Sequence, residues 1–209
     1  MRPSPAIPLT PHRLDGSQDG LRYVIRADLY RYDGATGGRS LLRVYLKEPG
    51  FRFTFWLRMA ACLQQRSALR RPFYWLSRWQ RRRYEIRYGI SIPCGADIGP
   101  GLFIGHFGGI VVHPQARIGR CCNLSNGVTI GHMNRGVRKG CPVIGDYVFI
   151  GPGAKILGKV IVGSHVAVGA NAVVTTDVED NQAVAGVPAR VISSRGSEGY
   201  VNWTDYDQP

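Results

Sequence analysis

The sequence contains no stretch of about 18 consecutive apolar residues, so it offers no segment that would cross a membrane as a helix. Its first residues also lack the apolar core of a signal peptide, because prolines and Asp15 interrupt them. Cysteines are few, and they form neither an even disulfide set nor a CxxC metal pattern: Cys62, Cys94, Cys121, Cys122 and Cys141. These absences predict a cytoplasmic protein with reduced thiols and no metal site.

Acidic residues are scarce, with 14 Asp and Glu against 27 Lys and Arg and a net charge of +13. The imbalance favours anionic partners. It is concentrated between Phe51 and Ile90, where ten arginines face one acid, Glu85, among ten aromatic residues. Two interpretations of the stretch 51–88 stay open: packing within an oligomer, and contact with the inner face of an anionic membrane. No nucleic-acid-binding motif accompanies these charges, so nucleic acid is not expected as a partner.

What the sequence does contain is enough hydrophobic residues for a core, 44%, and an excess of glycine, 27 residues without a three-residue period. We expect many tight turns. Residues 1–19, rich in proline, are interpreted as a flexible leader. Residues 20–90 are predicted to be α-helical, with apolar residues at three- and four-residue spacing: Leu41, Leu42 and Tyr45; Phe53, Trp56, Leu57, Ala60 and Leu63; Phe73, Leu76 and Trp79.

From Ile92 onward the aliphatic residues recur with a period of six, which fits neither a helix nor an alternating strand. They stand at Ile92, Ile98, Ile104, Val112, Ile118, Leu124, Ile130, Ile144, Ile150, Ile156, Val162, Val168 and Val174. Of the twelve from Ile98 on, eight are followed directly by glycine. Two shifts interrupt the series, one of two residues near Ile110 and one of eight residues between Ile130 and Ile144.

Each hexapeptide is interpreted as a short strand plus a turn, with the aliphatic residue inward and a small residue filling a corner four places later. Stacked coils then bury a continuous aliphatic column. The predicted fold class is mainly β, a β-helix over 91–178 with an inserted loop 132–142. It follows the helical segment and precedes a closing segment with a tail, 179–209.

These repeats resemble the hexapeptide-repeat acyltransferases, and within them the serine acetyltransferases and polysaccharide O-acetyltransferases. The likeness runs from Ala27-Asp28-Leu29 to Val187-Pro188-Ala189. It implies a left-handed parallel β-helix, a homotrimer, and acetyl-CoA as co-substrate in the groove between neighbouring prisms.

O-acetyl transfer needs a base for the acceptor hydroxyl, and histidine suits neutral pH. His106, in Ile104-Gly105-His106-Phe107-Gly108-Gly109, resembles the catalytic histidine of the family. His113, before a proline, is interpreted as a turn residue.

Two departures from the serine acetyltransferase pattern concern the acceptor. Gly105 stands where those enzymes place an aspartate before the histidine, and Gly140-Cys141 stands where they carry arginine and histidine. The predicted acceptor-binding residues are therefore Asp28, Asp33, His132, Arg138 and Cys141, and either aspartate, or a backbone carbonyl, is expected to orient His106. Nothing in the sequence supplies a base that would activate Cys141 as a nucleophile.

The turn Gly151-Pro152-Gly153-Ala154-Lys155 resembles the coil that meets the pantetheine arm, and Gly186-Val187-Pro188-Ala189-Arg190 resembles the ending that closes over the nucleotide. Lys155 and Arg190 would meet its phosphates. The predicted CoA-binding residues are Asn126, Gly151, Ala154, Lys155, Gly186, Val187, Pro188 and Arg190.

The leading hypothesis is acetyl transfer from acetyl-CoA to a hydroxyl of a sugar or lipid-linked glycan in surface polysaccharide biosynthesis, because the arginine–histidine pair is missing. The alternative is a serine O-acetyltransferase of cysteine biosynthesis. A zinc carbonic anhydrase of similar fold would need histidines five apart, whereas His106 and His113 are seven apart. A non-catalytic scaffold would leave His106 without a role.

Overall fold

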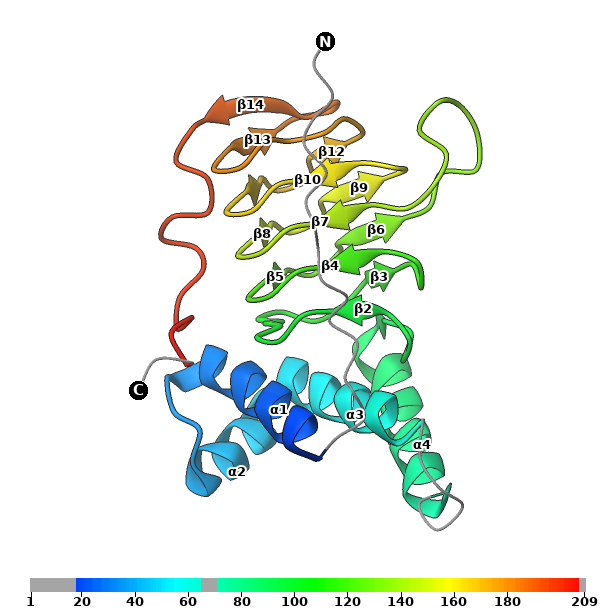
Figure 1. Ribbon diagram of the computed structural model, residues 1–209, viewed down its shortest axis with the longest axis vertical. Coiled ribbons are helices and arrows are strands. Elements are labelled where there is room, and N and C mark those ends of the chain that lie inside the picture. Colours follow the sequence, from blue (N-terminus) through cyan, green and yellow to red (C-terminus); the bar gives the residue numbers. More distant parts are fainter. Residues whose placement is uncertain (1–17, 65–70, 207–209) are drawn as a thin grey trace.

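The computed structural model describes residues 18–64 and 71–206, so the predicted leader 1–19 lies almost wholly outside the described residues. Four helices form one end of the molecule: α1 (Gln18–Asp33), α2 (Gly38–Lys47), α3 (Pro49–Leu63) and α4 (Arg71–Tyr88). A stack of short strands rises from them (Figure 1).

The strands form three sheets, one on each face of a prism. Sheet 1 holds β1 (Ile90–Ser91), β3 (Ile110–Val112), β6 (Thr129–Gly131), β9 (Lys155–Leu157) and β12 (Val173–Val174). Sheet 2 holds β2 (Asp97–Ile98), β4 (Arg117–Ile118), β7 (Val143–Ile144) and β10 (Ile161–Val162). Sheet 3 holds β5 (Asn123–Leu124), β8 (Phe149–Ile150), β11 (Ala167–Val168), β13 (Ala183–Ala185) and β14 (Arg190–Ser193).

Every pairing between these strands is parallel except that of β13 with β14. Ile144 pairs with Val162 and Ile150 with Val168, so one turn of the coil takes three hexapeptides. The architecture is the predicted left-handed parallel β-helix preceded by helices.

The core confirms the period of six residue by residue. All thirteen aliphatic residues of the series are at most 4% exposed, and the small residues four places on, such as Ala116, Cys122 and Ala172, fill the corners at 0% exposure. Burying each Val, Leu or Ile contributes about 1.5–3 kcal/mol. The β-helix is therefore stabilised by a column that runs its whole length.

The two shifts in the series correspond to two longer turns. The segment between Ile104 and Val112 is two residues longer than its counterpart between Leu124 and Ile130, and it carries His106. The loop 132–142 projects beyond the prism between β6 and β7, closed at its base by a bridge between Met133 and Gly140 (Figure 1).

The chain after β14 returns along sheet 3 to the helices (Figure 1). The ring of Tyr200 stacks on Phe149 with centroids 4.5 Å apart, and Asn123 donates a hydrogen bond to the Tyr200 carbonyl, 2.9 Å. Tyr206 contacts Tyr23 on α1. The C-terminal segment therefore covers the outside of sheet 3.

The helices bury different faces from some of those expected. Leu42 is 62% exposed, and Ser40 and Val44 are the buried residues of α2. Phe73, Leu76 and Trp79 on α4 are all exposed, whereas Ser77 and Tyr88 are buried. No helix of the described residues is long and apolar enough to span a bilayer.

Candidate active site

His106 lies on an exposed turn of the first coil, at the edge of the prism where sheet 3 passes into sheet 1. We call this the 3/1 edge. Ile104 and Ile110, both buried in the core, hold the two ends of the turn. Gly108 and Gly109 have positive φ angles of 109° and 66°, which glycine adopts without strain. The imidazole is thus presented to solvent from a short, anchored turn.

Two helices fix the backbone just before His106. The Tyr32 hydroxyl, on α1, accepts a hydrogen bond from the N–H of Ile104 at 3.1 Å and donates one to its carbonyl at 3.2 Å. On α3, a Cβ at Gly50 would collide with that same carbonyl oxygen. Glycine therefore lets α3 approach the first coil closely. The sequence analysis missed Tyr32 and Gly50, and no local motif marks either of them.

The Phe103 ring leaves no room for a side chain at position 105. A Cβ on Gly105 would lie 2.9 Å from the Phe103 ring, which packs at 4.6 Å from the Tyr32 ring. An aspartate at this position would have to displace Phe103. Within residues 18–64 and 71–206 the structure gives His106 no hydrogen-bond partner.

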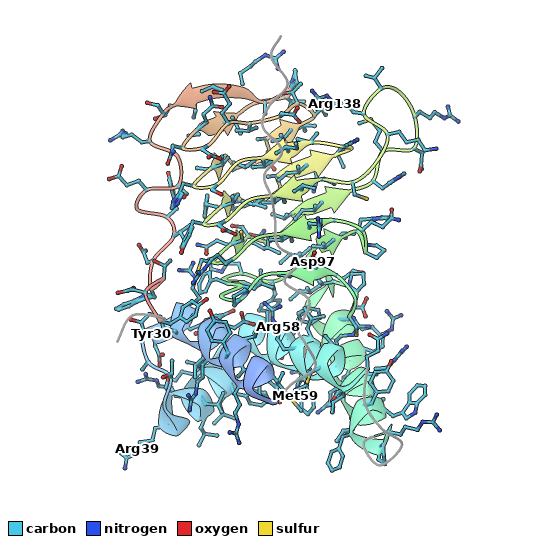
Figure 2. The ribbon with its side chains drawn as sticks, viewed as in Figure 1. Tyr30, Arg39, Arg58, Met59, Asp97 and Arg138 are labelled. Carbon is cyan, nitrogen blue, oxygen red and sulfur yellow. The ribbon has the colours of Figure 1, made fainter. Side chains whose placement is uncertain are left out.

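Asp28 does not lie in an acceptor site. It is 1% exposed, and its carboxylate accepts hydrogen bonds from Arg58 and from the backbone N–H groups of Gly101 and Leu102. Burial raises the pKa of Asp28, against the opposing effect of Arg58 and the two N–H donors. Arg58 also donates to the Ile98 carbonyl at 2.7 Å, where the helices meet the first coil (Figure 2). The prediction that Asp28 binds the acceptor is corrected, since the pair ties α1 and α3 to the β-helix.

Asp33 is likewise occupied locally. Its carboxylate accepts hydrogen bonds from Ser40 and Arg43 at the start of α2. Burial acts to raise the pKa of Asp33, but the hydrogen bonds from Arg43, Ser40 and the Ala35 N–H outweigh it and lower that pKa. Neither aspartate therefore orients His106.

The other turns of the 3/1 edge stack directly above His106. Backbone hydrogen bonds link them coil by coil, from Gly127 N–H to Gly108, from Gly153 N–H to Asn126 and from Asn171 N–H to Pro152. At the top, the Val173 N–H donates to Gly186 at 3.0 Å. Four coil spacings of about 4.8 Å separate the His106 turn from Gly186, roughly 19 Å in all. The structure thus aligns His106, Asn126 and the Gly186-Val187-Pro188 ending on one edge.

Two of the residues predicted to bind CoA lie inside the coil stack and not on its surface. Gly151 is buried and Ala154 is 0% exposed, and their backbone groups are used within the coil stack. Pro152 forms the exposed surface of that turn instead. Lys155 does lie along the edge, because its ammonium donates a hydrogen bond to the Gly127 carbonyl. Arg190 is exposed on β14.

The remaining acceptor candidates gather on another edge, between sheets 1 and 2, which we call the 1/2 edge. The His113 and His132 rings stack with centroids 5.3 Å apart, and the Cys141 Sγ lies 3.0 Å from the His113 Nδ1. The Gln115 N–H also donates to this Nδ1, at 3.2 Å. Burial raises the pKa of Cys141, which keeps the thiol protonated at neutral pH.

Arg138 belongs to the same edge but is engaged elsewhere. Its guanidinium pairs with Asp177 at 2.8 Å and donates to the Lys159 carbonyl at 3.3 Å, near the base of the projecting loop (Figure 2). The three residues of β3 separate the His106 turn from His113, roughly 10 Å at about 3.3 Å per residue. In one protomer, therefore, His106 and the His132–Cys141 group lie on two different edges of sheet 1.

Among the described ranges, no group of three or more histidine, cysteine or acidic side chains is placed to hold a metal ion.

Known proteins resemble this chain in both sequence and structure. Residues 141–176 match the family model of the bacterial transferase hexapeptide (six repeats). The chain is 36% identical over 155 residues to a serine acetyltransferase of Helicobacter pylori, covering 74% of this chain and 88% of that protein.

Solved structures agree with this likeness. The serine acetyltransferase of Brucella abortus strain S19 superposes with a TM-score of 0.65 at 34% identity, covering 84% of this chain and 68% of that one. A serine acetyltransferase in complex with CoA gives a TM-score of 0.65 at 28% identity, covering 84% and 71%.

Proposed function

This chain belongs to the hexapeptide-repeat acyltransferases, in the branch of the serine acetyltransferases, and we propose that it acetylates the side-chain hydroxyl of serine. It is an O-acyltransferase that takes its acetyl group from acetyl-CoA. The observation that carries the proposal is the placement of His106. The imidazole stands exposed at the foot of an edge whose upper turns include the Gly186-Val187-Pro188 ending.

In the proposed reaction His106 acts as the general base. It takes the proton of the serine hydroxyl as that oxygen attacks the thioester carbonyl of acetyl-CoA. The new C–O bond forms and the C–S bond breaks, and the proton passes from the imidazolium to the departing CoA sulfur. The products are O-acetylserine and CoA.

The donor would lie along the 3/1 edge. With the thioester at His106, the pantetheine arm would pass Asn126 and Pro152 and bring the nucleotide to Gly186, Val187 and Pro188. Lys155 and Arg190 would supply positive charge for the phosphates. The edge length of roughly 19 Å, four strand spacings, supports this path.

The active enzyme is proposed to be a homotrimer. His106 and the group of His132 and Cys141 lie on different edges of one protomer, so one copy alone does not bring them together. A neighbouring copy that sets its 1/2 edge beside the 3/1 edge of the first would do so. Cys94, Cys121, Cys122 and Cys141 form no disulfide within residues 18–64 and 71–206, which supports a reducing compartment such as the cytoplasm.

A glycan hydroxyl is kept as the second candidate acceptor. The comparisons lend no support to polysaccharide biosynthesis, since the relatives are named for serine. One feature nevertheless favours a bulkier acceptor. Gly140 and Cys141 stand where the resemblance places an arginine and a histidine, and Arg138 is paired with Asp177. The serine carboxylate would then need its charge-assisted partner from elsewhere.

The deciding experiment measures CoA release with a thiol reagent while the acceptor is varied. Serine, simple sugars and nucleotide-linked sugars are compared at matched concentrations, and His106→Asn gives the background hydrolysis. We expect kcat/KM for serine to exceed that for every sugar by at least about tenfold. A higher efficiency with any sugar would replace serine by the glycan candidate, and no release with any acceptor would overturn both.

A further inference from the structure

The outward face of α4 carries large apolar side chains that no residue of the described ranges 18–64 and 71–206 covers. Trp75, Trp79 and Ile86 are 61%, 58% and 70% exposed. With Arg82 they follow a spacing of four, three and four residues, which places them on one line along the helix. Leu76, 47% exposed, lies next to this line, whereas Phe73, 63% exposed, stands one turn before Ser77 on the other face.

Arginines flank this apolar line on both sides. The exposed ones are Arg71, Arg78, Arg82, Arg83 and Arg87. The guanidinium of Arg78 lies 5.5 Å from the Trp75 ring and that of Arg83 lies 5.7 Å from the Trp79 ring. The one acid of the helix, Glu85, has a side chain 14% exposed and is paired with Arg81 and Arg82.

The opposite face of α4 holds the helix in place. Ser77 and Tyr88 are buried, and the Ser77 hydroxyl donates to the Phe73 carbonyl at 2.7 Å. The Tyr88 ring stacks on Tyr84 and lies 5.2 Å from Phe107. Trp75 and Trp79 lie on the opposite side of the helix from Ser77 and Tyr88, at about 100° per residue.

We propose that this face of α4 binds the surface of a bilayer that contains anionic lipids. Tryptophan and isoleucine enter the boundary between headgroups and acyl chains, and the flanking arginines meet lipid phosphates. The aliphatic stems of the arginines extend along the apolar surface while their guanidinium groups reach outward. The apolar and the charged side chains can therefore contact the bilayer interface at the same depth.

The charge and the apolar side chains of this face favour an anionic bilayer over two other partners, a second copy of the chain and nucleic acid. A second copy docked face to face would bring two arginine clusters together with only Glu85, already paired, to offset them. Nucleic acid would engage the arginines through its phosphates but would leave Trp75, Trp79 and Ile86 without an apolar partner. An anionic bilayer satisfies the charges and the apolar line together.

The surface lies at the helical end of the molecule, away from the projecting loop (Figure 1). Through Tyr88 and Phe107 it is also next to the first coil, which carries His106. A bound enzyme would hold the end of the β-helix that carries β12 and β14 toward the aqueous phase. The proposal does not depend on the identity of the acceptor.

Cosedimentation with vesicles tests the proposal on the full chain. Vesicles of phosphatidylcholine alone are compared with vesicles containing about a third phosphatidylglycerol. We expect binding at least about tenfold tighter to the anionic vesicles, weakened by added salt. Trp75→Ala/Trp79→Ala and Arg78→Glu/Arg83→Glu should each lower the binding about tenfold or more, with CoA release in solution unchanged.

The matched controls lie on α2, where Leu42 and Leu46 are 62% and 64% exposed. Leu42→Ala/Leu46→Ala and Arg39→Glu should retain vesicle binding. Equal binding to both kinds of vesicle, or unchanged binding by the α4 variants, would overturn the proposal. So would a smaller oligomer for Trp75→Ala/Trp79→Ala in sedimentation velocity, or binding to single-stranded RNA in preference to anionic vesicles.

Discussion

The Tyr32 hydroxyl offers a direct test of whether the helices position His106. Replacing Tyr32 by Phe removes one oxygen atom and keeps the ring that packs on Phe103 and Phe51. That oxygen is bonded to both the N–H and the carbonyl of Ile104, two residues before His106. The change therefore releases the backbone of the catalytic turn without opening a cavity.

The expected magnitude follows from the two lost hydrogen bonds. Each contributes about 0.5–1.5 kcal/mol, and Ile104, only 1% exposed, is left with backbone groups that water reaches poorly. We expect a loss of about 1–3 kcal/mol in the free energy of unfolding. A displacement of His106 by about 1 Å should also lower kcat on the order of 10²-fold. The KM for acetyl-CoA should stay the same, because the upper turns of the 3/1 edge do not contact Tyr32.

The assay combines urea unfolding with steady-state CoA release at fixed protein concentration. Tyr30→Phe is the matched control, because Tyr30 lies on the same helix and its hydroxyl has no hydrogen-bond partner within the described chain. It should leave both measurements near wild type. If Tyr32→Phe lost stability but kept kcat within about threefold of wild type, the hydroxyl would stabilise the fold without positioning His106, and the reasoning would be refuted.

Three further predictions concern the base, the joint between helices and β-helix, and the thiol. His106→Asn should lower the rate of CoA release by roughly 10²–10⁴-fold with an unchanged circular dichroism spectrum, and a rate within threefold of wild type would remove the base assignment. Arg58→Met leaves the Asp28 carboxylate buried without its partner and should cost about 3–5 kcal/mol in urea unfolding, whereas adding Asp28→Asn should restore part of the loss; an unchanged midpoint would contradict the structural role of the pair. Because burial raises the pKa of Cys141, its alkylation by iodoacetamide, followed by peptide mass spectrometry, should keep accelerating as pH rises from 7 through 9. A rate already constant between pH 7 and pH 8 would indicate a thiolate paired with protonated His113.

The site could be predicted only in part. The turn that carries His106 is recognisable from its motif and from the two-residue shift in the period, and the structure shows the exposed turn that this shift produces. The assignment of the base itself remains a prediction. Asp28 and Asp33 were predicted to orient His106 in place of the aspartate missing at position 105, yet each is bound by an arginine close to it in space. A charged residue in a helix gives no local sign of whether it faces a ligand or a buried partner.

The helical segment shows the same limit. Apolar spacing in α4 predicts an amphipathic helix, and Leu76 and Trp79 do lie on an apolar surface, but that surface faces outward. Spacing determines which residues share a face. Which face packs inward depends on how α4 lies against α3 and the first coil, and the spacing within α4 does not specify that arrangement.

The sequence by itself determined the β-helix, because its interactions repeat locally. In the regular coils each strand pairs with the strand eighteen residues further on, so a period of six specifies both the inward residues and the stacking. The two longer turns raise this separation to 20 and 26 residues without changing which residues point inward. Only the tertiary structure decided which groups meet at the joint and along the edges. Tyr32 reaches Ile104 and His113 reaches Cys141 across separations that follow no period, because helix packing and the projecting loop set them. Such contacts depend on the folded shape as a whole, and no short stretch of the chain encodes them.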